Sequence, residues 1–323
     1  MNVLVIGGAG YIGSHIVLEL IQNNYKVLVF DDLSSGNEEN IDSQASFYNG
    51  SLLSQNDLEK IFSNKIDVVI HLAAFKAAGE SMVNPSKYLN NNVIGTSNLL
   101  IACQKFNIKN FIFSSTAAVY GNPQYLPIDE KHPKIPTNYY GESKLQIERN
   151  LDWFSRIYNF KYASLRYFNA TGYDNQMRIR GLENNPQNLI PSIMEFLVGK
   201  RNKFGIYGDD YNTKDGTAIR DYIHVTDLAR AHVLSIKYLQ NKKKNLILNL
   251  GTEKGYSVYD VVKTTEKIIN KKINFHKEPR RKGDIDILIA DYKKAYEILN
   301  WKPVHSEINE IIQTTWNIYK LYL

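Results

Sequence analysis

The stretch MNVLVIGGAGYIGSHIVLELIQ, residues 1–22, decides the fold that we expect for this chain. An apolar run leads directly into Gly7, Gly10 and Gly13, and a segment of helical period follows over residues 12–22. A strand, a glycine-rich turn and a helix in this order are typical of a site where the helix N-terminus binds a phosphate group. Glycine spacing alone suits a purely structural turn as well.

Short β-rich runs alternate with longer helical segments through the first half of the chain. The predicted strands cover residues 3–6, 26–30, 68–72 and 111–114, and the predicted helices include 12–22 and 88–105. Because the strands are near-continuous apolar runs, both faces of the sheet should be covered by helices. The sequence therefore predicts an α/β fold with a doubly wound, Rossmann-like parallel sheet.

The pattern becomes less regular after Asn169. A Gly/Asp/Asn-rich stretch at 207–216 is followed by helical runs at 227–239 and 258–269 and by a polar loop at 279–284. We therefore expect a dinucleotide-binding domain over residues 1–169. A smaller α/β substrate lobe should follow over residues 170–323, with some segments interleaved.

Composition places the chain among globular proteins, with 43% hydrophobic and 22% charged residues in 323. No run approaches the roughly 20 apolar residues of a membrane span, and the apolar start lacks the cationic segment of a secretory signal. We expect a soluble, cytoplasmic protein without a membrane partner. The lone Cys103 forms no internal disulfide, and the seven histidines show no metal-binding spacing, so we expect no metal.

The net charge of +6 is scattered along the chain and fits a small anionic ligand as well as nucleic acid. No aromatic-basic motif accompanies it, so nucleic acid is the weaker interpretation. Asp31 ends the second predicted strand, where a carboxylate can bind ribose hydroxyls and repel a 2′-phosphate. With no Lys or Arg between Asp31 and Asn37, a dinucleotide bound here should be NAD rather than NADP.

Tyr140 and Lys144, in NYYGESK, are four residues apart and should project from one helix face. This spacing is common, and Tyr259 with Lys263 shares it outside the expected cofactor site. A phenol with a pKa of about 10 must lose about 4 kcal/mol of proton affinity to act as a base near pH 7. One ammonium about 4 Å away stabilises the phenolate by an energy of this order, at an effective dielectric constant near 20. We expect Lys144 and a positive nicotinamide ring to provide this stabilisation together.

The segment FSSTAAVYG, residues 113–121, places Ser114, Ser115 and Thr116 at the carboxyl end of a strand, where doubly wound folds bind ligands. Thr116 is positioned to pass a proton to Tyr140. Taken alone, such a cluster is equally well explained as a cap on the strand end. The nearby Tyr140 and Lys144 favour the catalytic interpretation.

An ordered set of motifs in the chain resembles a known family. The motifs, in chain order, are GGAGYIG, HLAAFKAAGES, FSSTAAVYG, YYGESK, LRYFN, DGTAIRDYIHVTDLA and PRRKGD. Together they resemble the UDP-glucose (UDP-hexose) 4-epimerases of the extended short-chain dehydrogenase/reductase family over almost the whole chain. The resemblance implies NAD-dependent 4-epimerisation of UDP-hexoses through a transient 4-keto sugar, with Thr116, Tyr140 and Lys144 as catalytic residues.

The resemblance also implies two sets of ligand contacts. The positions implied for NAD are Gly7, Gly10, Tyr11, Ile12, Gly13, Asp31, Lys76, Asn92, Ser114, Tyr140, Lys144 and Tyr167. The positions implied for the UDP-sugar are Lys76, Thr116, Tyr140, Asn169, Asn188, Arg220, Arg281, Asp284 and Leu288. Two arginines opposite a diphosphate are also chemically reasonable, because each guanidinium donates paired charge-assisted hydrogen bonds.

The chain departs from the family pattern at several positions. Ser51 follows Gly50 where many relatives carry an aspartate that contacts adenine. Ala117 and Ala118 stand where sister 4,6-dehydratases and decarboxylases carry acidic residues, which makes those activities weaker alternatives. A catalytically silent NAD-binding protein on the same fold is the alternative from another class.

Two further expectations rest on the resemblance alone. Leu288 stands where relatives frequently have a tyrosine, so UDP-N-acetylglucosamine and UDP-N-acetylgalactosamine are expected as additional substrates. Packing of Leu288 into the lobe core, with a neighbour filling the space, is the alternative. Relatives dimerise through helices that correspond to residues 88–105 and 140–158, so we expect a homodimer.

Overall fold

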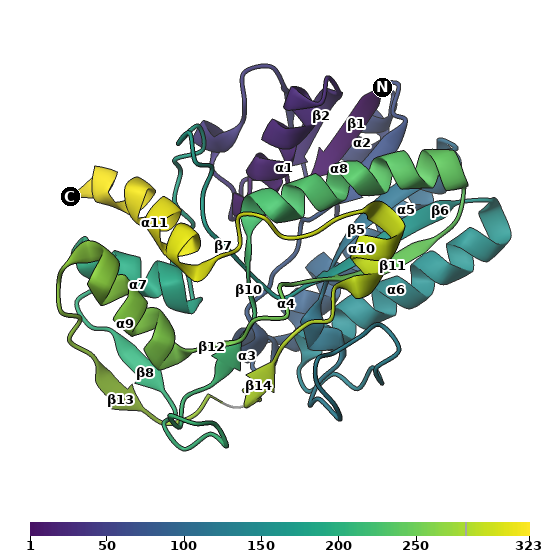
Figure 1. Ribbon diagram of the computed structural model, residues 1–323. Coiled ribbons are helices and arrows are strands. Elements are labelled where there is room, and N and C mark those ends of the chain that lie inside the picture. Colours follow the sequence, from purple (N-terminus) through teal and green to yellow (C-terminus); the bar gives the residue numbers. More distant parts are fainter. Residues whose placement is uncertain (282) are drawn as a thin grey trace.

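A seven-stranded sheet forms the centre of the computed structural model, which describes residues 1–281 and 283–323 (Figure 1). All neighbouring strands in this sheet are parallel. In spatial order they are β11 (Leu246–Leu250), β6 (Lys161–Tyr167), β5 (Asn110–Thr116), β4 (Val68–His71), β1 (Asn2–Ile6), β2 (Lys26–Asp31) and β3 (Ser46–Asn49). The chain order reverses between β1 and β4, which is where doubly wound sheets bind ligands.

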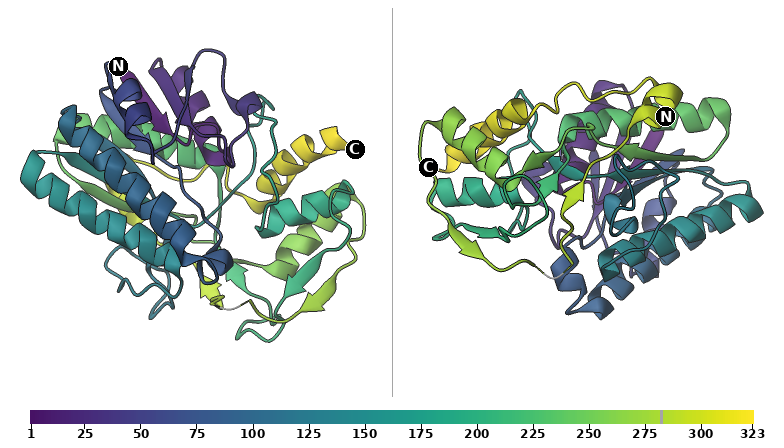
Figure 2. Two further views of the ribbon diagram at one scale, coloured as in Figure 1. Left: turned by 180° about the vertical axis from the view of Figure 1, so that it is seen from behind. Right: turned by 60° about the horizontal axis from the view of Figure 1, so that its bottom comes forward.

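Helices cover both faces of this sheet, as Figures 1 and 2 show. Alternate residues of β1 point to opposite cores, with Val3 and Val5 in one and Leu4 and Ile6 in the other. The first core contains residues of α1 (Tyr11–Gln22), α8 (Val225–Lys242) and α10 (Lys293–Leu299). The second contains residues of α2 (Gln55–Phe62), α5 (Gly95–Lys105) and α6 (Tyr139–Tyr158). The predicted doubly wound sheet is therefore confirmed.

A smaller lobe lies beside the carboxyl edge of the sheet and has its own apolar core. Its helices are α7 (Leu189–Leu197), α9 (Val258–Ile269) and α11 (Ile308–Tyr319). Its short strand groups are β7 (Asn169–Thr171) with β10 (Tyr222–His224), β8 (Gly205–Tyr207) with β13 (His276–Glu278), and β12 (Tyr256–Ser257) with β9 (Ile219–Arg220) and β14 (Ile287–Leu288). The remaining short helices are η1 (Glu38–Asn40), α3 (Ala78–Ser81), α4 (Pro85–Tyr88), η2 (Leu89–Ile94), η3 (Ala117–Val119) and η4 (Lys320–Tyr322).

Two features differ from the simplest expectation. The predicted helix over residues 88–105 is interrupted by the π-helical turn η2 before α5 begins at Gly95. Helix α8 and strand β11 belong to the second half of the chain but pack with the first-half sheet, so the division at residue 169 is crossed repeatedly and stays a prediction. In the part of the chain that the structure describes, no helix is long and apolar enough to span a bilayer.

The packing of the first turn of α1 generates a stability prediction. A Cβ at Gly13 would lie 2.0 Å from the Gly7 carbonyl oxygen, which cannot move without displacing β1. We expect Gly13→Ala to destabilise the protein by at least the ~1–3 kcal/mol typical of overpacking. Gly79→Ala is the matched control, because a Cβ at Gly79 meets nothing within 4 Å. Thermal unfolding of both variants measures the difference, and equal melting temperatures would contradict the close packing.

Candidate active site

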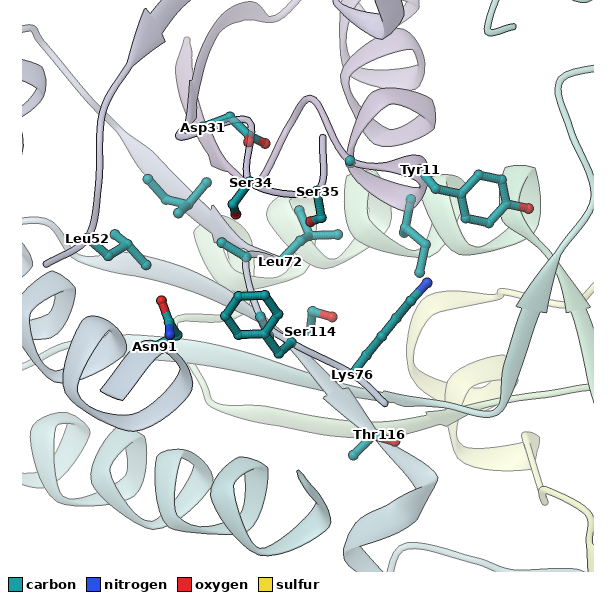
Figure 3. A pocket seen from close by; sticks show the side chains of 18 of the residues that line it. Tyr11, Asp31, Ser34, Ser35, Leu52, Leu72, Lys76, Asn91, Ser114 and Thr116 are labelled. Carbon is teal, nitrogen blue, oxygen red and sulfur yellow. The ribbon is translucent and has the colours of Figure 1, made fainter. Parts of the chain in front are cut away.

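A cavity opens at the carboxyl edge of the sheet, across the point where the strand order reverses. The loops after β1, β2, β4 and β5 form one side of this cavity, and the segment between β7 and α7 closes the other. The predicted site residues that line it are Gly7, Gly10, Tyr11, Ile12, Gly13, Asp31, Lys76, Ser114, Thr116, Tyr140, Lys144, Tyr167, Asn169 and Asn188. Side chains from distant parts of the sequence therefore meet in one space (Figure 3).

The glycine turn lies directly against the residues after β4. Gly7 adopts a φ of +83°, and a Cβ there would lie 2.6 Å from the Ala73 nitrogen. Gly10 precedes α1 and provides no side-chain cap, so the first backbone N–H groups of the helix face the cavity. Backbone approaches of this closeness leave room for a pyrophosphate at the helix N-terminus. The turn therefore fits a dinucleotide.

Asp31 ends β2 with its carboxylate held in place by the backbone. One carboxylate oxygen accepts a hydrogen bond from the Ala9 N–H at 3.0 Å, and the other accepts one from the Leu33 N–H at 2.9 Å. Burial raises the pKa of Asp31, while these two hydrogen bonds act to lower it. Each oxygen keeps a lone pair for a ribose hydroxyl. Ser34 and Ser35 also line this end of the cavity, as Figure 3 shows.

Local backbone packing places the Tyr140 side chain at the end of β5. Asn138 caps α6 by accepting a hydrogen bond from the Gly141 N–H at 2.9 Å. A Cβ at Gly141 would lie 2.4 Å from the Ala118 carbonyl oxygen. The first turn of α6 therefore rests on the residues that follow Thr116, and Tyr140 and Thr116 line the same part of the cavity.

Lys144 lies one turn further along α6, and its side chain is buried. Its ammonium donates a hydrogen bond to the Ser114 carbonyl oxygen at 2.9 Å and lies 6.0 Å from the centre of the Tyr140 ring. Burial lowers the pKa of Lys144 to about 7, and the charge of Glu148 acts in the opposite direction. Burial also raises the pKa of Tyr140 to about 12, against the effect of Thr116.

Burial adds a free-energy cost to the expected activation of Tyr140 by Lys144 and a positive nicotinamide ring. This cost is the desolvation of a phenolate, which raises the pKa of the phenol. In the protein without ligands, the Tyr140 phenol is therefore protonated at neutral pH.

Two more predicted residues shape this end of the cavity. The hydroxyls of Ser114 and Tyr167 form a short hydrogen bond between β5 and β6.

Asn92 does not line the cavity. Its side-chain amide is buried and forms hydrogen bonds with the backbone N–H and carbonyl of Phe75, both at 2.9 Å. Phe75 itself lines the cavity, so the structure places Asn92 behind the site wall.

Two contacts join the sheet side of the cavity to the segment that follows β7. The Lys76 ammonium pairs with the Glu183 carboxylate, and the Tyr11 hydroxyl donates to the Gly172 carbonyl. In Figure 3 the Lys76 side chain extends across the cavity to the side where Tyr11 lies. The sequence analysis missed Glu183, because the segment between β7 and α7 has no period and no motif. It also missed Asn91, which η2 turns into the cavity.

Four predicted substrate residues do not line this cavity, and three of them, Arg220, Arg281 and Asp284, form a separate polar group. Arg220 and Leu288 face each other in register between β9 and β14. The Asp284 carboxylate accepts hydrogen bonds from the Arg281 guanidinium at 3.1 Å and from the Tyr211 hydroxyl at 3.3 Å. Burial lowers the pKa of Arg220, against the attraction of Asp284. The group combines two guanidiniums with a tyrosine that the sequence analysis missed, and it suits an anion.

Leu288 is partly buried and does not line the cavity. It packs against a buried apolar cluster that contains Ala117 and Phe168. Ala117 follows Thr116 directly, and Phe168 precedes Asn169. In the described residues, no group of three or more potential ligand side chains is arranged to hold a metal ion.

Comparisons with known proteins agree with this geometry. A family described as "NAD dependent epimerase/dehydratase family" matches residues 3–251. A UDP-glucose 4-epimerase of Lacticaseibacillus casei is 44% identical over 98% of this chain and 96% of its own length. The crystal structure of UDP-glucose 4-epimerase from Brucella ovis with NAD has a TM-score of 0.94 and 41% identity, covering 98% of both chains.

A further solved structure, of the Bifidobacterium longum UDP-glucose 4-epimerase in complex with NAD+ and UDP, is similar to the same extent. Its TM-score is 0.95 at 38% identity, with 99% of this chain and 98% of that chain covered. A family match over most of the chain and relatives above 40% identity over nearly their full length lead to one conclusion. The chain belongs to the NAD dependent epimerase/dehydratase family.

Proposed function

We propose that this protein is an NAD-dependent 4-epimerase that interconverts UDP-glucose and UDP-galactose through a transient 4-keto sugar. The observation that carries the proposal is the meeting of Thr116, Tyr140 and Lys144 in one cavity with the glycine turn and Asp31. The similar proteins from Lacticaseibacillus casei, Brucella ovis and Bifidobacterium longum support the same substrate class.

When bound, NAD supplies the oxidation of the sugar at C4 and the later reduction on the other face. The glycine turn would hold its pyrophosphate, and Asp31 would hold its adenosine ribose. Ser51 lines the cavity near Asp31, and its hydroxyl would replace the usual acidic contact to adenine. Lys76 lies between the cofactor and sugar ends and would neutralise phosphate charge.

Tyr140 takes the proton from the sugar 4-hydroxyl, directly or through Thr116, and returns it after the ketose has turned over. Tyr140 must be a phenolate before it takes this proton, and the Lys144 ammonium stabilises that phenolate by charge. Since burial raises the pKa of Tyr140 to about 12, this step requires the positive charges of the complete site. The two guanidiniums Arg220 and Arg281 would bind the diphosphate of UDP while the sugar turns.

The alternatives are less well supported by the residues in the cavity. Dehydration or decarboxylation after the same oxidation needs an acidic group beside the Ser/Thr, and Ala117 and Ala118 stand there. Of the acidic residues that line the cavity, Asp31 and Asp32 lie at the end of β2, and Glu183 pairs with Lys76. A silent NAD-binding protein would have no use for the three reactive side chains.

We also propose a homodimer in the cytoplasm. Helices α5 and α6 lie side by side on the outside of the sheet (Figure 2). Both helices expose large apolar side chains. Ile101, Trp153 and Ile157 are each 58–62% exposed there, which is unusual for a monomer and suits a second copy of the chain. Light scattering should give twice the chain mass of 37.1 kDa; a mass of one chain would contradict the dimer.

The first functional prediction concerns Tyr140. Tyr140→Phe deletes a proton-transfer group but no contact to the diphosphate, so turnover should fall about 10²- to 10⁴-fold while UDP affinity stays within twofold. Thr116→Val should have a smaller effect if Tyr140 reaches the 4-hydroxyl directly. Tyr259→Phe, at the other YxxxK sequence, is the control and should be kinetically silent. A Tyr140→Phe variant with more than half the wild-type rate would refute the assignment.

The second functional prediction concerns substrate range. Leu288 is shorter than the tyrosine of many relatives, so the site should also accept UDP-N-acetylglucosamine and UDP-N-acetylgalactosamine. An overpacked pocket typically costs ~1–3 kcal/mol, so Leu288→Tyr should lower kcat/KM for N-acetylated sugars by about 5- to 150-fold and spare the plain hexoses. If wild type rejects N-acetylated sugars, or if the variant turns over both classes equally, Leu288 does not control substrate range.

A further inference from the structure

Glu148 is a buried carboxylate on the face of α6 that carries the reactive side chains. Tyr140, Lys144 and Glu148 follow one another at intervals of four residues, so they project from the same side of the helix. The Glu148 side chain is 6% exposed and does not line the cavity. It therefore cannot contact a ligand directly.

The Glu148 carboxylate ties α6 to two strands of the sheet. One oxygen accepts hydrogen bonds from the Ser115 hydroxyl at 2.6 Å and from the Ser164 hydroxyl at 2.8 Å. The Arg166 guanidinium donates to both carboxylate oxygens, at 2.8 Å and 2.5 Å. Ser115 belongs to β5, and Ser164 and Arg166 belong to β6. A single side chain therefore fixes the carboxyl ends of both strands against the helix.

The β5 contact lies between two residues of the reaction site. Ser115 is preceded by Ser114, whose carbonyl binds the Lys144 ammonium, and is followed by Thr116. Any shift of α6 along or around its axis would change the position of Tyr140 and Lys144 relative to this strand end. The guanidinium is itself fixed, because it donates to the Tyr120 hydroxyl at 2.9 Å and that hydroxyl donates to Asn249 at 2.6 Å.

We propose that Glu148 is a positioning residue for the reaction: its bonds to β5 and β6 hold Tyr140 and Lys144 against Thr116, and its charge acts on the Lys144 ammonium. Arg166 contributes by binding both oxygens of the Glu148 carboxylate, which keeps it charged and fixes its orientation. This inference rests on the proposed function, because it assigns Glu148 a part in the same reaction.

The groups around Lys144 define the direction of the charge effect. Glu148 and Tyr140 face Lys144 from its own helix, His71 from β4, and the Phe113 ring from β5 at 4.8 Å, while Tyr167 of β6 lines the same cavity. Burial and the Lys144 charge lower the pKa of His71 to about 3, so this imidazole is neutral at working pH. Loss of the Glu148 charge should therefore lower the pKa of Lys144 further, so that the ammonium loses its proton at a lower pH.

The test compares Glu148→Gln with wild type by kcat, KM and pH profile. We expect kcat to fall at least tenfold with KM within twofold, and the alkaline limb of the kcat profile to move to lower pH. Ser115→Ala removes one hydrogen bond and no charge. It should lower kcat severalfold at unchanged KM and leave the pH profile in place.

Two further variants separate an effect on the stability of the protein from an effect on the positions of the reactive side chains. Glu148→Gln/Arg166→Met removes both buried charges at similar volume, which avoids leaving an unpaired guanidinium. It should melt closer to wild type than Glu148→Gln but keep the low kcat. Asp227→Asn is the matched control, because Asp227 is a fully buried carboxylate that accepts hydrogen bonds from Val304, His305 and Ser306 and has no contact with the site. Its pH profile should match wild type.

The inference is overturned if folded Glu148→Gln and Ser115→Ala keep the wild-type kcat and pH profile. It is also overturned if Asp227→Asn shifts the profile as Glu148→Gln does, because the effect then reflects general destabilisation. If Glu148→Gln does not fold, the double variant and Ser115→Ala decide the question alone. An inactive wild type would instead refute the proposed function, so the two failures are distinguishable.

Discussion

The structure depends on a backbone contact at the centre of its sheet, where the residues after β1 meet the residues after β4. Gly7 can approach Ala73 only because it has no side chain, and Gly13 can approach Gly7 for the same reason. This contact directs the N-terminus of α1 into the opening between the two halves of the sheet. The other residues that line the cavity lie on strand ends, loops and helices at this edge or in the segment between β7 and α7.

The central sheet could be predicted from the sequence because its strands are buried on both faces and read as apolar runs. The glycine turn, Asp31 and the Tyr140–Lys144 pair were also predictable, since each depends on local spacing. Glu183 and Tyr211 were not, because their positions depend on how irregular segments pack against residues distant in the sequence. The burial that raises the pKa of Tyr140 could not be predicted for a related reason: spacing shows which charge is near, and only the packed structure shows how much water is excluded.

Burial acts in opposite directions on the two titratable groups of the reaction site. It raises the pKa of Tyr140 to about 12 and lowers the pKa of Lys144 to about 7, because it disfavours a phenolate and an ammonium alike. The ligand-free site therefore has a phenol that holds its proton and an ammonium that is close to losing one. Chemistry near neutral pH depends on charges around this pair, which gives physical weight to the buried Glu148 carboxylate one turn away and to the positive cofactor that the cavity fits.

The central claim is that this chain carries out an oxidation and a reduction that cancel, so that it needs no external oxidant. The direct measurement is to incubate purified protein with UDP-galactose without added NAD, identify the sugar products, and assay the supernatant of denatured protein for NAD. The account predicts a mixture of UDP-glucose and UDP-galactose and about one NAD per chain, because a cycle that regenerates its oxidant has no reason to release it. Unchanged UDP-galactose, from protein that neither contains nor binds NAD, would contradict it.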